Sequence, residues 1–132
     1  MVCEIVMNIL REKGHEVEML LAKLIEPVDL GEYDLLILAS PTHGHGVLEA
    51  YFEKFLDKME AMDLKGKKVA VIGLGDPKYD TDYHLEAARI IMLFLQKKEA
   101  VPVGMPCRVT RQPLLLMENY IKPWAEKLAE QI

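Results

Sequence analysis

The sequence has little cysteine. Its 132 residues include two, Cys3 and Cys107. They lie far apart in the chain and form neither a metal-type nor a redox-type pair, so no disulfide framework is expected. The sequence also contains eight methionines. A methionine-rich chain without disulfides is typical of a reducing compartment, and we therefore expect a cytoplasmic protein.

Long hydrophobic runs and an excess of basic residues are also missing. Lys, Glu or Asp interrupts every apolar stretch, which argues against a transmembrane helix. Residues 1–16 have no basic leader and no small-residue cleavage site, so no signal peptide is expected. Lys and Arg total 16 against 21 Asp and Glu, a net charge of −5. Such an acidic chain is a poor candidate for binding nucleic acid or an anionic membrane.

The composition that remains is that of a soluble globular domain. Hydrophobic residues make up 51% of the chain and charged residues 28%, close to the average for folded proteins. A chain of this length is about one domain and can bury a self-sufficient core. We therefore expect residues 1–132 to form a single domain.

Strand and helix patterns alternate along the chain. Continuous apolar runs at 35–39 and 69–73 predict strands that are buried on both faces. Two further strands are predicted at 16–21 and, with a proline that suits a sheet edge, at 100–103. Helical spacing of apolar residues predicts helices at 2–10, 48–59, about 82–95 and 113–128, the first ending near Gly14. This alternation is typical of an α/β protein with a parallel sheet and helices on both faces.

Two loops follow the apolar strands, at the edge of a parallel sheet where ligands bind. The first, at 40–48, offers hydroxyl groups, glycines and a nearby helix N-terminus. The second, at 73–80, contains Gly75, which lets the chain bend back, and Tyr79, whose ring would project over the strand ends. The two loops suit a planar aromatic ligand. By spacing alone, Tyr79 could equally serve to cover the end of the sheet.

The residues resemble the flavodoxin family over nearly the whole chain. The most specific piece is the Gly-x-Gly-Asp-x-x-Tyr segment that ends at Tyr79. The other matching pieces follow in the expected order: Glu32-Tyr33-Asp34, Ser40-Pro41-Thr42-His43-Gly44, the helix with Phe52 and Phe55, residues 64–70, and Trp124 in the final helix.

The resemblance implies FMN as the cofactor and electron transfer as the activity, with no catalytic residue and no metal. The first loop would pack against one face of the isoalloxazine ring, and Tyr79 would stack on the outer face. Where many family members carry Trp or Tyr, this chain has His43. The implied cofactor-binding residues are Ser40, Pro41, Thr42, His43, Gly44, His45, Gly46, Gly73, Leu74, Gly75, Asp76, Tyr79 and Asp80.

The resemblance also implies a central strand and a phosphate-binding loop before the first helix. Residues 1–10 have the apolar spacing of a helix and not of a strand. We therefore expect a flavodoxin-like sheet in which the N-terminal strand and the phosphate loop are absent from this chain. The phosphate of FMN would lose its anion-binding cradle. The sheet would then close its gap or pair with a second copy as a homodimer.

Acidic residues gather around the second loop. We expect Asp76, Asp80 and Asp82, with Glu49 and Glu53, to form a rim that docks a basic redox protein. Negative charge beside a flavin also lowers its reduction potential. Two alternatives to an electron carrier remain open: a flavin-dependent NAD(P)H or quinone reductase, and a flavin-free interaction module.

Overall fold

The computed structural model describes residues 2–24, 26, 30–43, 47–48, 50–75, 86–110 and 114–132, with the backbone alone at 41–43, 47–48, 75, 86, 110 and 114–118. The chain divides into two compact units. Residues 1–20 and 112–132 make up the first unit, and residues 21–111 the second. Among the described residues, no helix is long and apolar enough to cross a membrane.

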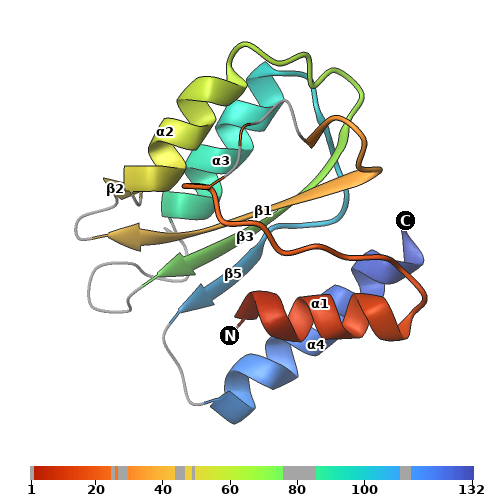
Figure 1. Ribbon diagram of the computed structural model, residues 1–132. Helices are drawn as coiled ribbons and strands as arrows, with labels where there is room; N and C mark the ends of the chain where they lie inside the picture. Colours follow the sequence, from red (N-terminus) through yellow and green to blue (C-terminus); the bar gives the residue numbers. More distant parts are fainter. Residues whose placement is uncertain are drawn as a thin grey trace. The chain divides into compact units, whose positions relative to one another are not determined.

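The second unit is an open, mainly parallel sheet with two helices (Figure 1). Strand β1 (Leu35–His43) pairs in parallel with β3 (Lys68–Gly75). On its other side, β3 pairs in parallel with β4 (Val101–Pro102) and then with β5 (Cys107–Thr110). The short strand β2 (Val47–Leu48) is antiparallel to the end of β1. The predicted parallel sheet is thus confirmed.

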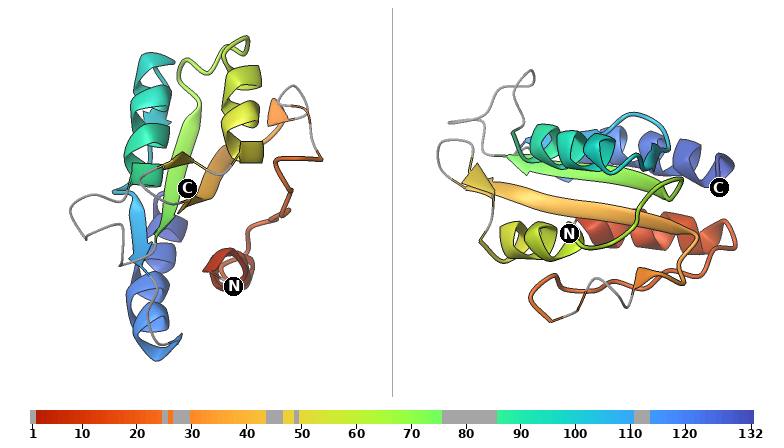
Figure 2. Two further views of the ribbon diagram at one scale, coloured as in Figure 1. Left: turned by 90° about the vertical axis from the view of Figure 1, so that its left-hand side faces the viewer. Right: turned by 90° about the horizontal axis from the view of Figure 1, so that it is seen from above.

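Both helices of this unit cover the same face of the sheet. Leu36 and Leu38 of β1 share one face with Val69 and Val71 of β3, since side chains alternate along a strand. These four residues belong to one buried cluster with α2 (Ala50–Met59) and α3 (Glu86–Lys97), whose inward residues include Phe55, Met59, Ile91 and Leu95. Figure 2 shows the two helices beside the strands. On the opposite face of β3, Ala70 and Ile72 are also buried. Burial on both faces of β3 explains why residues 69–73 are apolar at successive positions.

The first unit pairs α1 (Val2–Glu12) with α4 (Leu114–Glu130), and the two helices contact each other (Figure 1). In α1 the buried residues are Val2, Val6, Ile9 and Leu10. They recur at the spacing of one helix face, which is why this segment is helical and not extended. The helix predicted at 2–10 is confirmed.

The C-terminus of α1 has the glycine cap predicted from the sequence. Gly14 has a φ of 92°, in the left-handed region that glycine adopts without a steric penalty. The His15 amide donates to the Leu10 carbonyl at 3.1 Å, and the Gly14 amide donates to the Arg11 carbonyl at 3.0 Å. These two bonds satisfy carbonyls that the helix itself leaves unpaired.

Helix α3 ends in the same motif with a residue that suits it less well. The Ala100 amide donates to the Leu95 carbonyl and the Glu99 amide to the Gln96 carbonyl, both at 3.1 Å. Glu99, however, takes the left-handed conformation with a φ of 58°. A side chain there brings Cβ close to the following carbonyl oxygen.

We expect Glu99→Gly to stabilise the protein by about 0.5–1 kcal/mol, because glycine relieves that strain at a cost in unfolded-state entropy. Urea unfolding, followed through the single tryptophan, measures the change. Glu99→Ala is the matched control, since it removes the carboxylate but keeps Cβ. Equal stabilities of the glycine and alanine variants would contradict the interpretation.

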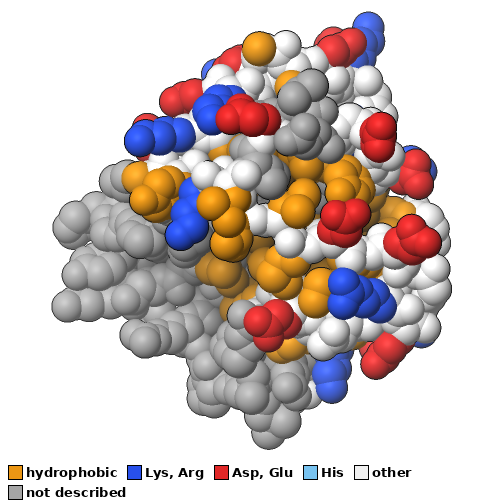
Figure 3. Space-filling view, in the orientation of Figure 1, with side chains coloured by type: hydrophobic (Ala, Val, Ile, Leu, Met, Phe, Trp, Pro, Cys, Tyr) orange, Lys and Arg blue, Asp and Glu red, His pale blue; other side chains and the backbone are white. Residues whose placement is uncertain are grey.

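The predicted strand at 16–21 is wrong. These residues are described and belong to no strand, and the Val17 carbonyl accepts a bond from the Arg11 guanidinium at 2.7 Å. Alternation of side chains is not sufficient for a strand, which also needs a neighbour to pair with. Apolar side chains here reach the surface: Met19, Leu20 and Leu21 are 46%, 40% and 55% exposed. Figure 3 shows hydrophobic side chains on one face of the molecule.

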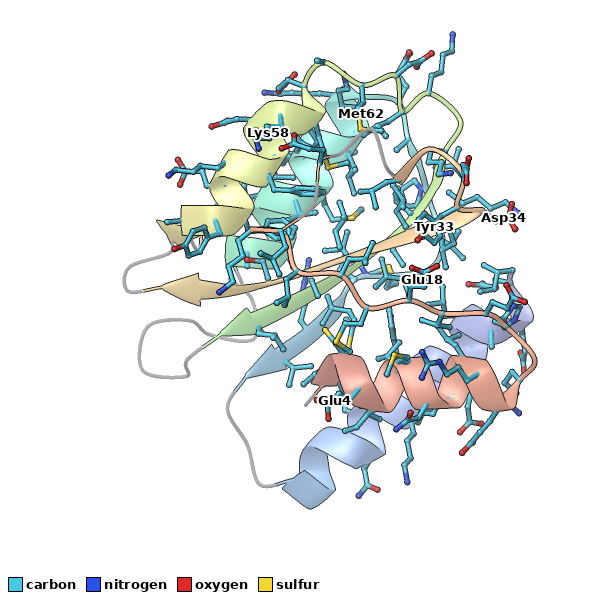
Figure 4. The ribbon with its side chains drawn as sticks, viewed as in Figure 1. Glu4, Glu18, Tyr33, Asp34, Lys58 and Met62 are labelled. Carbon is cyan, nitrogen blue, oxygen red and sulfur yellow. The ribbon has the colours of Figure 1, made fainter. Side chains whose placement is uncertain are left out.

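Lys23 and Glu26 contact side chains of α2. The Lys58 ammonium, labelled in Figure 4, lies 3.0 Å from the Glu26 carboxylate. The Lys23 ammonium lies 5.7 Å from the centre of the Tyr51 ring. The ion pair and the cation–π contact are both exposed, so each contributes little stability. Ala22 adds apolar contact by packing against the buried cluster.

Candidate functional site

Three chain segments leave the sheet at one edge. Ser40 of β1 lies beside Gly73 of β3, which in turn lies beside Arg108 of β5. Because these strands are parallel, the segments that follow them all begin at the carboxyl edge. This edge is where open α/β sheets bind ligands. The two loops predicted to form a site therefore leave neighbouring strands.

The first predicted loop begins later than the sequence suggested. Ser40, Pro41, Thr42 and His43 belong to β1 and not to a loop. His43 pairs with Val47 of the antiparallel strand β2, and α2 begins at Ala50. Past the apolar run, β1 continues through Ser40 and Pro41 by pairing with β3, and through Thr42 and His43 by antiparallel pairing with β2. The Ser40 side chain is 1% exposed and lies within the fold.

The second predicted loop also begins later, because Gly73, Leu74 and Gly75 are the last residues of β3. Gly73 has a packing role of its own. A Cβ atom built on it would lie 2.6 Å from the Ala88 Cβ and 2.9 Å from the Ala88 backbone nitrogen. The missing side chain lets α3 pack directly on the end of β3. The end of β3 and the first turn of α3 therefore lie in contact with each other.

The remaining predicted site residues fall outside the described ones. They are Gly44, His45, Gly46, Asp76, Tyr79 and Asp80, together with Asp82 and Glu49 of the expected acidic rim. Of that rim, Glu53 is described and lies exposed on α2. The residues Tyr33 and Asp34, which also match the family, lie at the start of β1, at the opposite end from the site (Figure 4). Tyr33 packs against the buried cluster.

Strand β5 is an element that the sequence interpretation missed. Cys107 is fully buried in this strand beside Ile72. Buried Cys107 and Val109 alternate with exposed Arg108, and this period of two was the available signal. Thr110 is the last residue of β5 and lies beside Gly75, so β5 also ends at the carboxyl edge of the sheet.

Neither a metal site nor a thiol pair is built from the described residues. They contain no group of three or more His, Cys, Asp or Glu that could hold a metal ion. Cys3 is half-buried in α1 and Cys107 is buried; both are free thiols.

The reactivity of the Cys3 thiol should depend on pH in a way set by its burial. Burial is the main cause that raises the pKa of this thiol above the ordinary 9.0. A raised pKa disfavours the reactive thiolate. We expect the alkylation rate of Cys3 by iodoacetamide, in a Cys107→Ala background, to reach half its maximum above pH 9.0. The urea-unfolded chain is the control. A native midpoint at or below the unfolded one would contradict this.

Comparison with known proteins gives consistent matches. The model of the flavodoxin family matches residues 1–124. A flavodoxin of Maridesulfovibrio salexigens is 31% identical over 98% of this chain and 87% of its own length. Crystalline flavodoxin 2 of Bacillus cereus aligns with a TM-score of 0.91 at 30% identity, covering 99% of this chain and 89% of that one. A Fusobacterium nucleatum flavodoxin bound to flavin mononucleotide shares the fold, with a TM-score of 0.78 at 18% identity over 99% and 89% of the two chains.

Proposed function

The chain belongs to the flavodoxin family, and we propose that it is an electron carrier that binds FMN at the carboxyl edge of β1 and β3. The observation that carries the proposal is the register of Ser40 beside Gly73. Because of this register, the glycine-containing segments that follow β1 and β3 begin at neighbouring positions on the carboxyl edge of the sheet. A planar ring held between them would have a loop on each face. FMN, when bound, supplies the capacity to accept and release electrons.

The proposed site has two layers: residues that support the cofactor from beneath, and residues that contact the ring. Ser40 is buried and Gly73 is closed off by Ala88, so we assign both to support beneath the cofactor. The contacts to the ring are then assigned to residues farther along each chain, namely His43 and residues 44–46 on one side and Asp76 and Tyr79 on the other. This chain's own part is to position the ring and to exclude water from its faces.

The proposed charge around the site is negative. Asp76, Asp80 and Asp82, which the sequence places in the second loop, would disfavour further negative charge on the flavin and lower its reduction potential. Together with Glu49 and the exposed Glu53, they would attract a basic redox protein. Attraction of this kind weakens as salt screens the charges.

An electron-transfer assay distinguishes a carrier from an enzyme of the same fold. The FMN-loaded protein, reduced with dithionite and freed of excess reductant, is mixed with cytochrome c, a basic acceptor. We expect stoichiometric reduction at a rate that falls with added salt. We also expect no steady NADPH oxidation unless a separate reductase is present. Steady NADPH oxidation by the protein alone would instead favour the reductase alternative, and no reduction of cytochrome c would contradict the carrier.

A further inference from the structure

A cationic side chain, Arg108, lies near the carboxyl edge of the sheet. It is the second residue of β5 and lies beside Gly73 in the parallel register with β3 (Figure 1). The Arg108 side chain is exposed, whereas its two neighbours in the strand are buried. The last pair of this register is Gly75 with Thr110. Arg108 therefore lies one strand away from β3 and two residues short of the point where the second predicted loop leaves it.

The same register sets the face of the sheet on which Arg108 lies. Residues paired across parallel strands share a face, and Gly73 faces α3, since a Cβ atom built on it would meet Ala88. Arg108 is thus on the face that α3 covers, next to a residue without a side chain. Arg89 of α3 is exposed as well, but Ala87 and Ala88 are the residues of that turn that pack into the buried cluster. Of the two arginines, Arg108 is the one that the sheet itself holds at this edge.

Helix α3 adds positive potential at the same place. It is 12 residues long and begins at Glu86, two residues before the Ala88 that packs against the end of β3. Its N-terminus is therefore at the carboxyl edge, where the unpaired amides of a first helical turn carry about half a positive charge. Arg108 and this helix end both oppose the negative charge that we expect from the second loop.

We propose that Arg108 raises the reduction potential of the bound flavin through its positive charge. This inference rests on the proposed function, because it requires FMN at the carboxyl edge. When a reduced dye supplies two electrons and the solvent supplies one proton, the flavin ring gains one negative charge. A nearby positive charge stabilises the more negative form. Arg108 would therefore favour the reduced flavin over the oxidised flavin without contacting the ring.

The sign of this effect does not depend on which group the Arg108 guanidinium contacts. If that group is a carboxylate, removing the arginine leaves the negative charge of the carboxylate uncompensated, and the reduced flavin is again disfavoured. The size of the effect depends on distance and screening. Two unit charges roughly 10 Å apart at a protein surface shift an equilibrium by about threefold to tenfold at low salt.

Equilibration with a reference dye tests the proposal. The FMN-loaded protein and the dye are reduced together without oxygen, and absorption gives the ratio of reduced to oxidised flavin when the dye is half reduced. We expect Arg108→Gln to lower this ratio by about threefold to tenfold at low salt. Arg108→Lys keeps the charge, so its ratio should stay within about twofold of the original. In 1 M NaCl, where the screening length is about 3 Å, the effect of Arg108→Gln should fall below about twofold.

Lys97→Gln is the matched control for a change in net charge. Lys97 is exposed and is the last residue of α3, a helix about 18 Å long, so its charge lies far from the carboxyl edge. Its removal should leave the ratio within about twofold of the original. Equal ratios for Arg108→Gln and Arg108→Lys would overturn the assignment of Arg108. An equal fall in Lys97→Gln, or a failure of Arg108→Gln to fold, would overturn it too. If the unchanged protein bound no FMN, the proposed function would be contradicted, and this inference with it.

Discussion

Replacing Gly73 with alanine is expected to destabilise the protein by about 1–3 kcal/mol, the usual cost of overpacking a core. The added Cβ would lie 2.6 Å from the Ala88 Cβ and 2.9 Å from the Ala88 backbone nitrogen. The second of these contacts is with the backbone of a helix, which a rotamer change cannot relieve. Helix α3 would have to move away from the end of β3.

Urea unfolding of Gly73→Ala, Ala88→Gly and the double variant measures this effect. Ala88→Gly alone loses helix propensity, about 1 kcal/mol. In the double variant the shorter of the two contacts is gone, so its destabilisation should be clearly smaller than the sum of the single values. Strict additivity would show that the contact between Gly73 and Ala88 does not govern stability here.

Replacing Tyr79 with alanine is expected to weaken FMN binding by roughly tenfold to a hundredfold, without unfolding the protein. Under the proposed function, Tyr79 stacks on the outer face of the flavin. Aromatic stacking on a planar base is worth roughly 1–3 kcal/mol by alanine substitution. Quenching of FMN fluorescence during titration measures the affinity.

Tyr79→Phe is the matched control, because it keeps the ring and removes only the hydroxyl group. Its affinity for FMN should stay within about threefold of the original, since stacking depends on the ring face. If Tyr79→Ala binds FMN as tightly as the unchanged protein, Tyr79 has no stacking role and serves only to cover the end of the sheet.

The sequence was sufficient to predict the elements whose buried residues recur at a regular period within one short segment of the chain. The run at 69–73 is apolar at successive positions because β3 is buried on both faces, and in the run at 35–39 one face of β1 is buried and the other half-buried. The face of α1 and the cap at Gly14 are equally local features. In each case the determining contacts repeat at a period that is visible in a short window.

The features that depend on a distant partner could not be predicted. Strand β1 continues to His43 because β2 folds back on it, and the polar residues there gave no apolar signal. Residues 16–21 have strand-like alternation but no neighbour within the described residues. For Gly73, the loop motif suggested a ligand, whereas the structure gives close packing on Ala88 as a reason for glycine. That contact joins residues that the sequence alone does not bring together.

The most direct test of the proposed function is a titration of FMN with the purified, flavin-free protein. We expect saturable quenching of flavin fluorescence at one FMN per chain, with a shift of the visible flavin absorption as the ring leaves water. Unchanged fluorescence and absorption with the protein in excess over FMN would contradict the proposal. They would favour a flavin-free interaction module on the same fold.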